Sequence, residues 1–473
     1  HLNASRSLLR SREAKIENAQ IHLRAAQQAA KSAAFEAALQ YVTAAMDNLP
    51  DGLSATHLDL ARSLYCARGE FEYLHGNFTA AEHYIRQAIE FETDNHTKAE
   101  LHHILVTHYT LRAAYADAIA AGRAGLALLS VFLPEEYLPS VRDDMLARVD
   151  HLLGDRSFDS LSTLPPMTDR TQSVAMKLLI AMGPPGYRSH PRLWSVLVAQ
   201  EMSLFLEHGL GPGATYTFPA FGGLRQYLGL GSARECEALH AATSLVLRSV
   251  NQASEASIGH LMLASSLDHW FSPLSRASQD YRHAFTIGIE SGNLQYAAYA
   301  LAHDAYCKFY QGLPLDKLAN EIENAQDFCA KRKNIWGMAI TEGISLITRA
   351  LTAETNQSEP ILGGSAEAEY LRKCWDHGNV QVLGIYHTLA AEAYLHLGQF
   401  EAAADTLRQA AEHLDCFATQ GLLPSIQYHF VHALLLLWVP HCFEVSPDEG
   451  LARASNILVK IERWADDCPA NFR

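Results

Sequence analysis

The chain has 473 residues, of which 48% are hydrophobic and 19% charged, and its formal net charge is −15. This composition excludes an intrinsically disordered chain, because enough apolar material is present for a core. The acidic balance argues against a nucleic-acid partner, since a phosphate backbone would be repelled. A compact protein of this length would divide into domains of about 100–200 residues, whereas a solenoid buries each repeat only against its neighbours.

Two distant segments have nearly the same sequence. Residues 73–81 read YLHGNFTAA, and residues 394–403 read YLHLGQFEAA. Each predicts a helix that ends at a glycine, a tight turn, and a second helix that packs on small alanines. Antiparallel helix pairs of this kind are the units of tetratricopeptide-like solenoids, so the sequence predicts an array of helical hairpins.

Alanine and aromatic residues mark the second helix of each predicted hairpin. The first three of these hairpins are spaced by more than the ~34 residues of a strict tetratricopeptide repeat, which indicates longer helices or loops. We expect the alanines to let the two helices approach closely and the aromatic residues to fill the seams between hairpins. The alanines are Ala38, Ala81, Ala118 and Ala403, and the aromatic residues are Phe35, Phe78, Tyr115 and Phe400.

The sequence predicts five segments along the chain. They are N-terminal hairpins (1–130), an irregular helical section with proline- and glycine-rich loops (131–231), central hairpins (232–354), a loop (355–365) and C-terminal hairpins (366–473). We expect the last segment to be truncated and the loop at 355–365 to be a hinge or protease-sensitive site. A helix that begins near Thr171 is predicted to stop at the GPPG sequence of residues 183–186.

The irregular section has an unusual density of aromatic residues among glycines, at Tyr216, Phe218 and Phe221. One interpretation is that the glycines lie in tight turns or where helices touch. The alternative is a loop that closes over a ligand, with these three residues as a possible contact patch for a partner.

The sequence lacks the common catalytic motifs. It has no Gly-Lys-Ser/Thr phosphate loop, no Gly-x-Ser-x-Gly elbow and no His-Glu-x-x-His helix. Among the 24 histidines, His429 and His432 are spaced to share a helix face, but two ligands without a third are weak grounds for a metal site. The eight cysteines have no CxxC spacing and are expected to be free thiols. We therefore expect no cofactor, no metal and no catalytic residue.

The most apolar run, residues 430–439, is interrupted by His432 and is far shorter than the ~20 residues of a membrane span. No signal peptide is visible at the N-terminus. The expected location is the cytoplasm, without a membrane span.

Several short motifs occur in a particular order: LPxMTD at 164–169, PPxY at 184–187, WxxPL at 270–274, GIxSGN at 288–293, GxPL at 312–315 and WAxxCPxNF at 464–472. In this order they resemble the helical-repeat region of large signalling proteins. Those proteins have a serine/threonine-kinase-like domain and a STAND-type ATPase domain before the repeats, and often a GAF domain and a histidine kinase after them. The resemblance implies a regulatory role, and it transfers no catalytic residue, because the family's kinase and ATPase motifs lie in other domains.

The predicted fold is all-α: a right-handed α-α superhelix of tetratricopeptide-like hairpins with an irregular central section. The predicted function is a non-catalytic sensor and protein-interaction scaffold that regulates a neighbouring ATPase or kinase domain. Its partner would be another protein or an adjacent domain of the same chain. One alternative is a small-molecule receptor with an enclosed polar pocket. Another is a helical enzyme, which would require perturbed acid–base groups that meet in one cleft.

Overall fold

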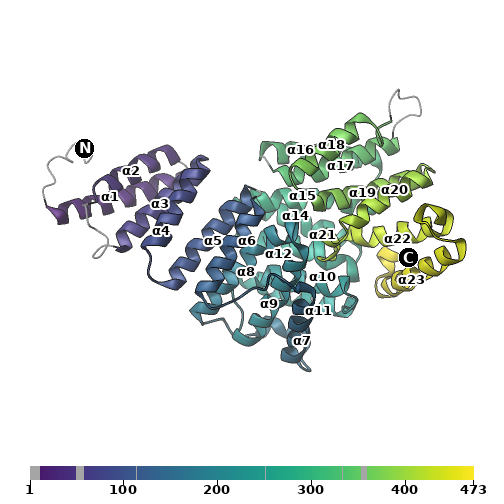
Figure 1. The fold of residues 1–473 in the computed structure, drawn as a ribbon, viewed down its shortest axis with the longest axis horizontal. Coiled ribbons are helices and arrows are strands. Elements are labelled where there is room, and N and C mark those ends of the chain that lie inside the picture. Colours follow the sequence, from purple (N-terminus) through teal and green to yellow (C-terminus); the bar gives the residue numbers. More distant parts are fainter. Residues whose placement is uncertain are drawn as a thin grey trace. The chain divides into compact units, whose positions relative to one another are not determined.

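The computed structural model describes residues 11–32, 34–49, 58–112, 114–250, 252–332, 334–352 and 360–473. These residues form α-helices and short 3-10 helices joined by turns, and consecutive helices lie side by side as hairpins (Figure 1). They contain no β-strand; an isolated bridge joins Pro166 and Leu210. The predicted fold class, an all-α superhelix of helical hairpins, is confirmed.

The chain divides into two compact units. The first comprises the described residues up to Glu135 together with Asp169–Pro185, and the second comprises Glu136–Thr168 and Gly186–Arg473. The five segments predicted from the sequence concern the organisation of repeats and stay a prediction.

The first unit is a row of three hairpins followed by most of α8. The hairpins pair α1 with α2, α3 with α4, and α5 with α6. Their alternating apolar faces form the core, in which Ala19, Ala26, Val42 and Leu64 are buried. The helices are α1 (Arg12–Lys31), α2 (Phe35–Asp47), α3 (Leu58–His75), α4 (Phe78–Phe91), α5 (Asn95–Leu111), α6 (Tyr115–Leu128) and α8 (Arg170–Ser189).

The second unit contains the remaining helices. Most of its neighbours in sequence also pair: α10 with α11, α14 with α15, α16 with α17, α19 with α20, and α22 with α23. The longer helices are α7 (Leu138–Leu153), α9 (Pro191–His208), α10 (Ala214–Tyr227), α11 (Ala233–Ser249), α12 (Ala253–Ser266), α14 (Leu274–Ser291), α15 (Leu294–Tyr310), α16 (Leu315–Lys331), α17 (Ile335–Thr352), α18 (Ser365–Asp376), α19 (Val380–His396), α20 (Phe400–Glu412), α22 (Leu423–Trp438) and α23 (Pro447–Asp467). The short ones are η3 (Phe158–Thr163), α13 (Asp268–Phe271), α21 (Asp415–Ala418), η4 (Pro440–Phe443) and α24 (Pro469–Phe472).

The two repeated motifs form the predicted turns. Gly76 follows α3 with φ +93°, and Gly398 follows α19 with φ +72°. A residue with a side chain adopts these angles only with strain, so glycine ends the first helix of each hairpin.

The structure agrees with the prediction for the alanines of the repeats but not with that for every aromatic residue. The four alanine markers are completely buried, as predicted, which allows close packing of the helix pairs. The prediction for the aromatic residues is wrong for Phe78, whose side chain is 40% exposed. Phe78 is the first residue of α4, at the rim of the hairpin. There its ring contacts the Tyr73 ring and the Arg112 guanidinium and does not fill the seam between two hairpins.

The predicted stop at residues 183–186 is wrong, because α8 continues through Pro184 and Pro185 to Ser189. A proline inside a helix removes a backbone hydrogen bond and favours a break. Here Met182 before the prolines and Tyr187 after them are both buried, so packing outweighs the local preference. The prolines mark the boundary between the two compact units instead of the end of a helix, since the first unit ends at Pro185.

The loop predicted at 355–365 lies partly outside the described residues, which resume at residue 360. Residues 360–364 are non-helical and lead into α18. None of the helices in the described part of the chain combines the length and the apolar character that crossing a bilayer requires.

Candidate functional site

The three residues predicted as a contact patch lie inside the second unit. Tyr216, Phe218 and Phe221 belong to α10, and they are 7%, 0% and 0% exposed. The predicted loop is therefore a helix, and the glycines are sites of close approach, which was the other interpretation of this segment. A Cβ atom on Gly223 would lie 2.1 Å from the carbonyl oxygen of Gln420. Since a partner cannot reach these aromatic side chains in this fold, they are not part of the function proposed below.

A buried carboxylate lies next to this aromatic core. Glu201 of α9 is completely buried and accepts a hydrogen bond of 2.7 Å from the Thr217 hydroxyl through Oε2, whereas its Oε1 has no partner. Burial raises the pKa of Glu201 to about 8. The side chain of Trp194 donates a hydrogen bond of 2.8 Å to the Tyr216 hydroxyl nearby. The carboxyl group is thus held in the core.

A second network of aromatic and polar side chains connects the end of α8 with α15, α17 and α19. Arg188 donates a hydrogen bond to the Tyr299 hydroxyl, and its guanidinium lies 4.9 Å from the centre of the Tyr299 ring. The Tyr299 ring packs edge-on against Trp336 at 5.1 Å. Trp336 in turn donates a hydrogen bond of 3.0 Å to Oε1 of Gln381. We call Tyr187, Arg188, Tyr299, Trp336 and Gln381 the aromatic–polar network.

Two groups of this network lack a partner that meets hydrogen-bond geometry: the Tyr187 hydroxyl and Nε2 of Gln381. Burial raises the pKa of Tyr187, and the neighbouring Gln381 amide opposes that rise. Next to the network, burial and the Arg188 charge lower the pKa of His303 to about 3, so its imidazole is neutral at physiological pH. Unpaired buried polar groups cost free energy unless water or a ligand completes them.

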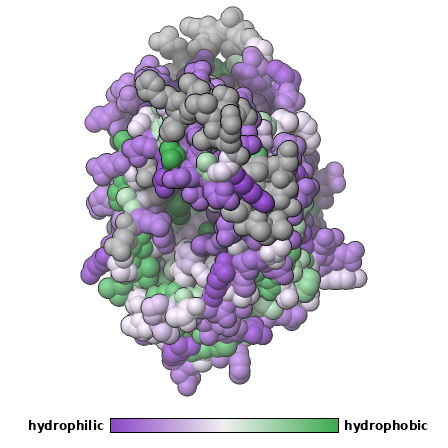
Figure 2. Space-filling model, turned by 90° about the vertical axis from the view of Figure 1, so that its left-hand side faces the viewer, coloured by the Kyte–Doolittle hydropathy of each residue, from purple (hydrophilic) through white to green (hydrophobic). Residues whose placement is uncertain are grey.

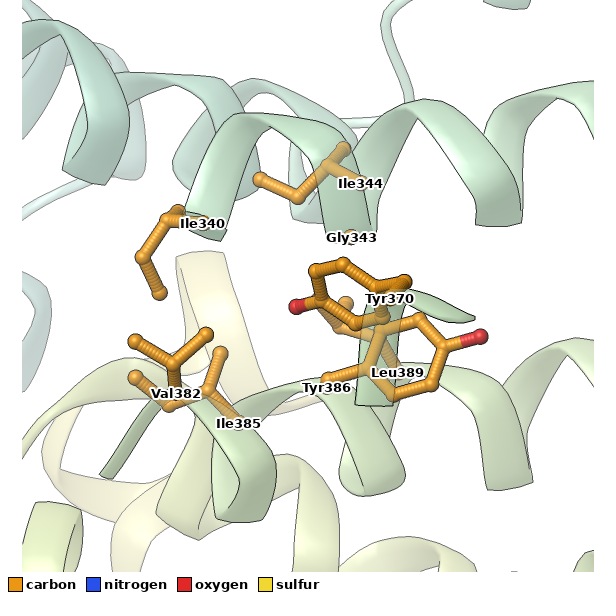
Figure 3. A pocket seen from close by; sticks show the side chains of 8 residues that line it. All are labelled: Ile340, Gly343, Ile344, Tyr370, Val382, Ile385, Tyr386 and Leu389. Carbon is orange, nitrogen blue, oxygen red and sulfur yellow. The ribbon is translucent and has the colours of Figure 1, made fainter. Parts of the chain in front are cut away.

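The crevice between α17, α18 and α19 is a packing defect between hairpins rather than a binding site (Figure 3). It is a shallow crevice without room for a water molecule inside it. Its wall is apolar, with Tyr370 and Tyr386 turned towards Gly343, and both hydroxyls are engaged elsewhere, on Ala339 and Glu367. The other lining residues are Ile340, Ile344, Val382, Ile385 and Leu389.

Helices α22 and α23 expose an unusual amount of apolar surface. They hold six of the 17 large hydrophobic residues that the described part of the chain exposes, and the other eleven are spread over the rest. On the face in Figure 2, by contrast, hydrophilic residues predominate and hydrophobic ones form only small groups. We call these six residues the α22–α23 apolar face: Phe430, Leu437, Trp438, Leu451, Leu458 and Val459.

The spacing of these residues explains their exposure. Phe430 and Leu437 are seven residues apart on α22, as are Leu451 and Leu458 on α23, so each pair lies on one side of its helix. Leu436 of α22 and Ala454 of α23 are buried in one apolar cluster that joins the two helices. The helix pair therefore buries one set of apolar side chains and leaves these six at least partly exposed, with Trp438 also packed against Phe400 of α20.

The two histidines selected from the sequence, His429 and His432, have different neighbours. His429 Nε2 accepts a hydrogen bond of 3.2 Å from Lys460, and burial together with that charge lowers the pKa of His429 to about 3. His432 packs against Phe443. All eight cysteines lie in the described residues and all are free thiols, as predicted.

Comparisons with known proteins identify no family. No family model matches the chain, and no curated protein matches it. The solved structures to which the chain is similar include the following three. One is Naa15/Naa10 bound to HypK-THB, with 12% identity, TM-score 0.26, and coverage of 95% of this chain and 88% of that chain. The second is the P58(IPK) TPR domain, with 13% identity, TM-score 0.21, and coverage of 93% and 98%. The third is a circular tandem repeat protein with 14% identity, TM-score 0.13, and coverage of 98% and 95%. At these TM-scores the likeness supports no argument about fold or function.

Proposed function

We propose that the chain is a non-catalytic recognition scaffold whose α22–α23 apolar face binds a protein partner. The observation that supports this proposal is the concentration of exposed apolar side chains on one helix pair. Soluble proteins rarely expose large apolar patches, and a gathering of exposed apolar side chains commonly marks a protein interface. Aromatic residues such as Phe430 and Trp438 are also the types that contribute most to binding energy at interfaces.

The partner that fits best is an adjacent domain of the same gene product, namely a STAND-type ATPase or kinase domain. The order of motifs in the sequence resembles proteins with that architecture. In this arrangement the scaffold holds or releases its neighbour as a signal arrives, and the apolar face is covered in one state and exposed in the other.

The test is binding between this chain and the separately purified ATPase domain of the gene product. Glutamate at Phe430 and Leu437 should weaken binding by about tenfold or more, because a charge would be buried at the interface centre. The matched control is Leu245→Glu, since Leu245 is 48% exposed on α11, outside the apolar face. Wild-type protein that fails to bind the domain, or equal binding by the double variant, would reject the proposal.

A second candidate function is the binding of a small polar ligand, and the unpaired groups of the aromatic–polar network favour it. Tyrosine, tryptophan, arginine and an amide together provide stacking surfaces and hydrogen bonds, which suit a polar ligand with an apolar face. A thermal-shift screen with metabolites distinguishes this function from protein binding. A ligand at about 100 times its Kd should raise the free energy of unfolding by about 2.7 kcal/mol, and Gln381→Met should abolish the rise.

A further inference from the structure

Four helices of the second unit bring two aspartates and three histidines together. His240 lies on α11, His260 on α12, Asp268 on α13, and Asp280 and His283 on α14. The potential ligand atoms of His260, Asp280 and His283 all lie within 4.8 Å of one another, and so do those of His240, Asp268 and Asp280. Asp280 belongs to both sets. The residues are far apart in sequence, apart from the Asp280-x-x-His283 pair on one side of α14.

The outer set has the composition and access of a metal site. His260 Nδ1 is hydrogen-bonded to Asp280 Oδ1 at 2.6 Å, and His283 Nδ1 lies 3.8 Å from the same oxygen. One of these distances is shorter and the other longer than the roughly 3.3 Å that separates two ligand atoms of one tetrahedral zinc ion. The His283 side chain is 64% exposed, which provides a path from solvent, whereas that of Asp280 is only 11% exposed.

The inner set holds a buried carboxyl group without a hydrogen-bond partner. Asp268 has no exposed side-chain surface, and neither of its carboxylate oxygens has a partner. His240 Nε2 lies 3.3 Å from Asp268 Oδ1, but it accepts a hydrogen bond from Arg276. Arg276 itself is 3.8 Å from Asp268 and half-exposed. Two carboxylates within 4.8 Å in a buried site repel each other unless a cation or a proton lies between them.

We propose that this cluster is a binding site for one divalent transition-metal ion of the zinc class. His260, Asp280 and His283 are the ligands, water completes the coordination, and the unpaired carboxylate of Asp268 adds the negative charge that favours a cation. Two imidazoles and one carboxylate suit Zn²⁺ better than Ca²⁺ or Mg²⁺, which prefer oxygen ligands. The ion would connect α12 with α14, and Arg276 would keep its hydrogen bond to His240.

The experiment is a titration of the full chain with Zn²⁺ alone, after dialysis against a chelator. We expect one ion per chain and a rise in the thermal midpoint. The double variant His260→Ala/His283→Ala should lose affinity by more than about 100-fold, since even the outer-shell partners of a metal ligand commonly contribute 10- to 100-fold. Asp268→Asn should weaken binding by about tenfold, and the exposed His151 provides the control His151→Ala, which should bind as the wild type does.

Cobalt distinguishes this site from the cysteines, because a thiolate ligand adds an intense charge-transfer band to the Co²⁺ spectrum that imidazole and carboxylate ligands do not. Circular dichroism shows whether each variant is folded. If the double variant does not fold, His283→Ala alone decides, since its side chain is largely exposed. If the wild type does not bind Zn²⁺ stoichiometrically, the proposal is overturned, and a proton shared between Asp268 and Asp280 is the remaining explanation for their proximity. Binding that survives in the double variant, or a thiolate band, would overturn it as well.

Discussion

Gly223 of α10 lies directly against the carbonyl group of Gln420, at the turn between α21 and α22. A Cβ atom on Gly223 would come within 2.1 Å of that oxygen, and Gly421 next to it has φ +69°. Two backbone segments almost 200 positions apart in sequence therefore meet without an intervening side chain. This contact joins α10 to the turn before α22 within the second unit.

Replacing Gly223 with alanine should destabilise the protein by about 3 kcal/mol or more, since overpacking of this size forces a backbone to move. The matched control is Gly186→Ala, because a Cβ at Gly186 in α8 would make only ordinary contacts, at 3.5 Å or more. That substitution should be neutral or stabilise by about 0.5–1 kcal/mol. Urea unfolding of both variants measures the difference, and equal stabilities would refute the contact.

Glu201 should make stability depend on pH in a predictable direction. Its pKa in the fold is about 8, above the ordinary 4.5, so the folded state favours the neutral acid. Below pH 4.5 the Glu201 side chain is protonated in both the folded and the unfolded state, so it does not make stability depend on pH. Between pH 4.5 and 8 the unfolded state ionises first, so the free energy of unfolding falls by up to roughly 1.4 kcal/mol per pH unit.

Glu201→Gln removes this ionisation while it keeps an acceptor for Thr217. The variant should therefore gain stability relative to the wild type as pH rises from 5 to 8, as measured by urea midpoints. The control is Glu237→Gln on the exposed side of α11, which should change the pH profile little. A wild type and a Glu201→Gln variant with parallel profiles would show that the carboxylate is ionised in the fold.

Phe218 and Phe221 should act as core residues. Each is completely buried, with the Phe218 ring 5.5 Å from Phe205 and the Phe221 ring 5.9 Å from Phe158. Alanine at either position should cost about 3–5 kcal/mol of unfolding free energy. Trp375→Ala is the control, because Trp375 is 65% exposed and its loss should change stability little. If the alanine variants of Phe218 and Phe221 were stable but bound a partner differently, the contact patch predicted from the sequence would be supported.

Gly343 and Tyr370 should be energetically coupled. A Cβ at Gly343 would lie 2.5 Å from the Tyr370 hydroxyl, which donates a hydrogen bond of 3.0 Å to the Ala339 carbonyl. Tyr370→Phe alone should cost about 1 kcal/mol. Gly343→Ala should cost less in the Tyr370→Phe background than in the wild type, because the clashing hydroxyl is absent. Strictly additive free energies in this double-mutant cycle would argue against the packing shown in Figure 3.

The sequence predicts the hairpins well because their signals are local. A glycine that ends a helix and an alanine that packs against its partner depend on a few neighbouring residues, and Gly76, Gly398, Ala81 and Ala403 are as expected. The failures have the opposite cause. Pro184 and Pro185 continue a helix, and Gly223 lies within one, because of contacts with distant residues that no local pattern encodes.

The candidate sites were harder to predict than the fold. The ligand set of His260, Asp280 and His283 comes from two helices, and only the Asp280-x-x-His283 spacing is visible in sequence. Exposure of Phe430 and Leu437 depends on which side of α22 packs against α23. The run of apolar residues at 430–439 signals a buried helix as readily as an exposed apolar face.

The most direct test of the proposed function is hydrogen–deuterium exchange of this chain with and without the ATPase or kinase domain that we propose as its partner. Binding at the α22–α23 apolar face should slow exchange in the peptides that cover Leu423–Trp438 and Pro447–Asp467, with little change in α1–α6. Unchanged exchange in those two helices, together with slower exchange on another face, would contradict the account.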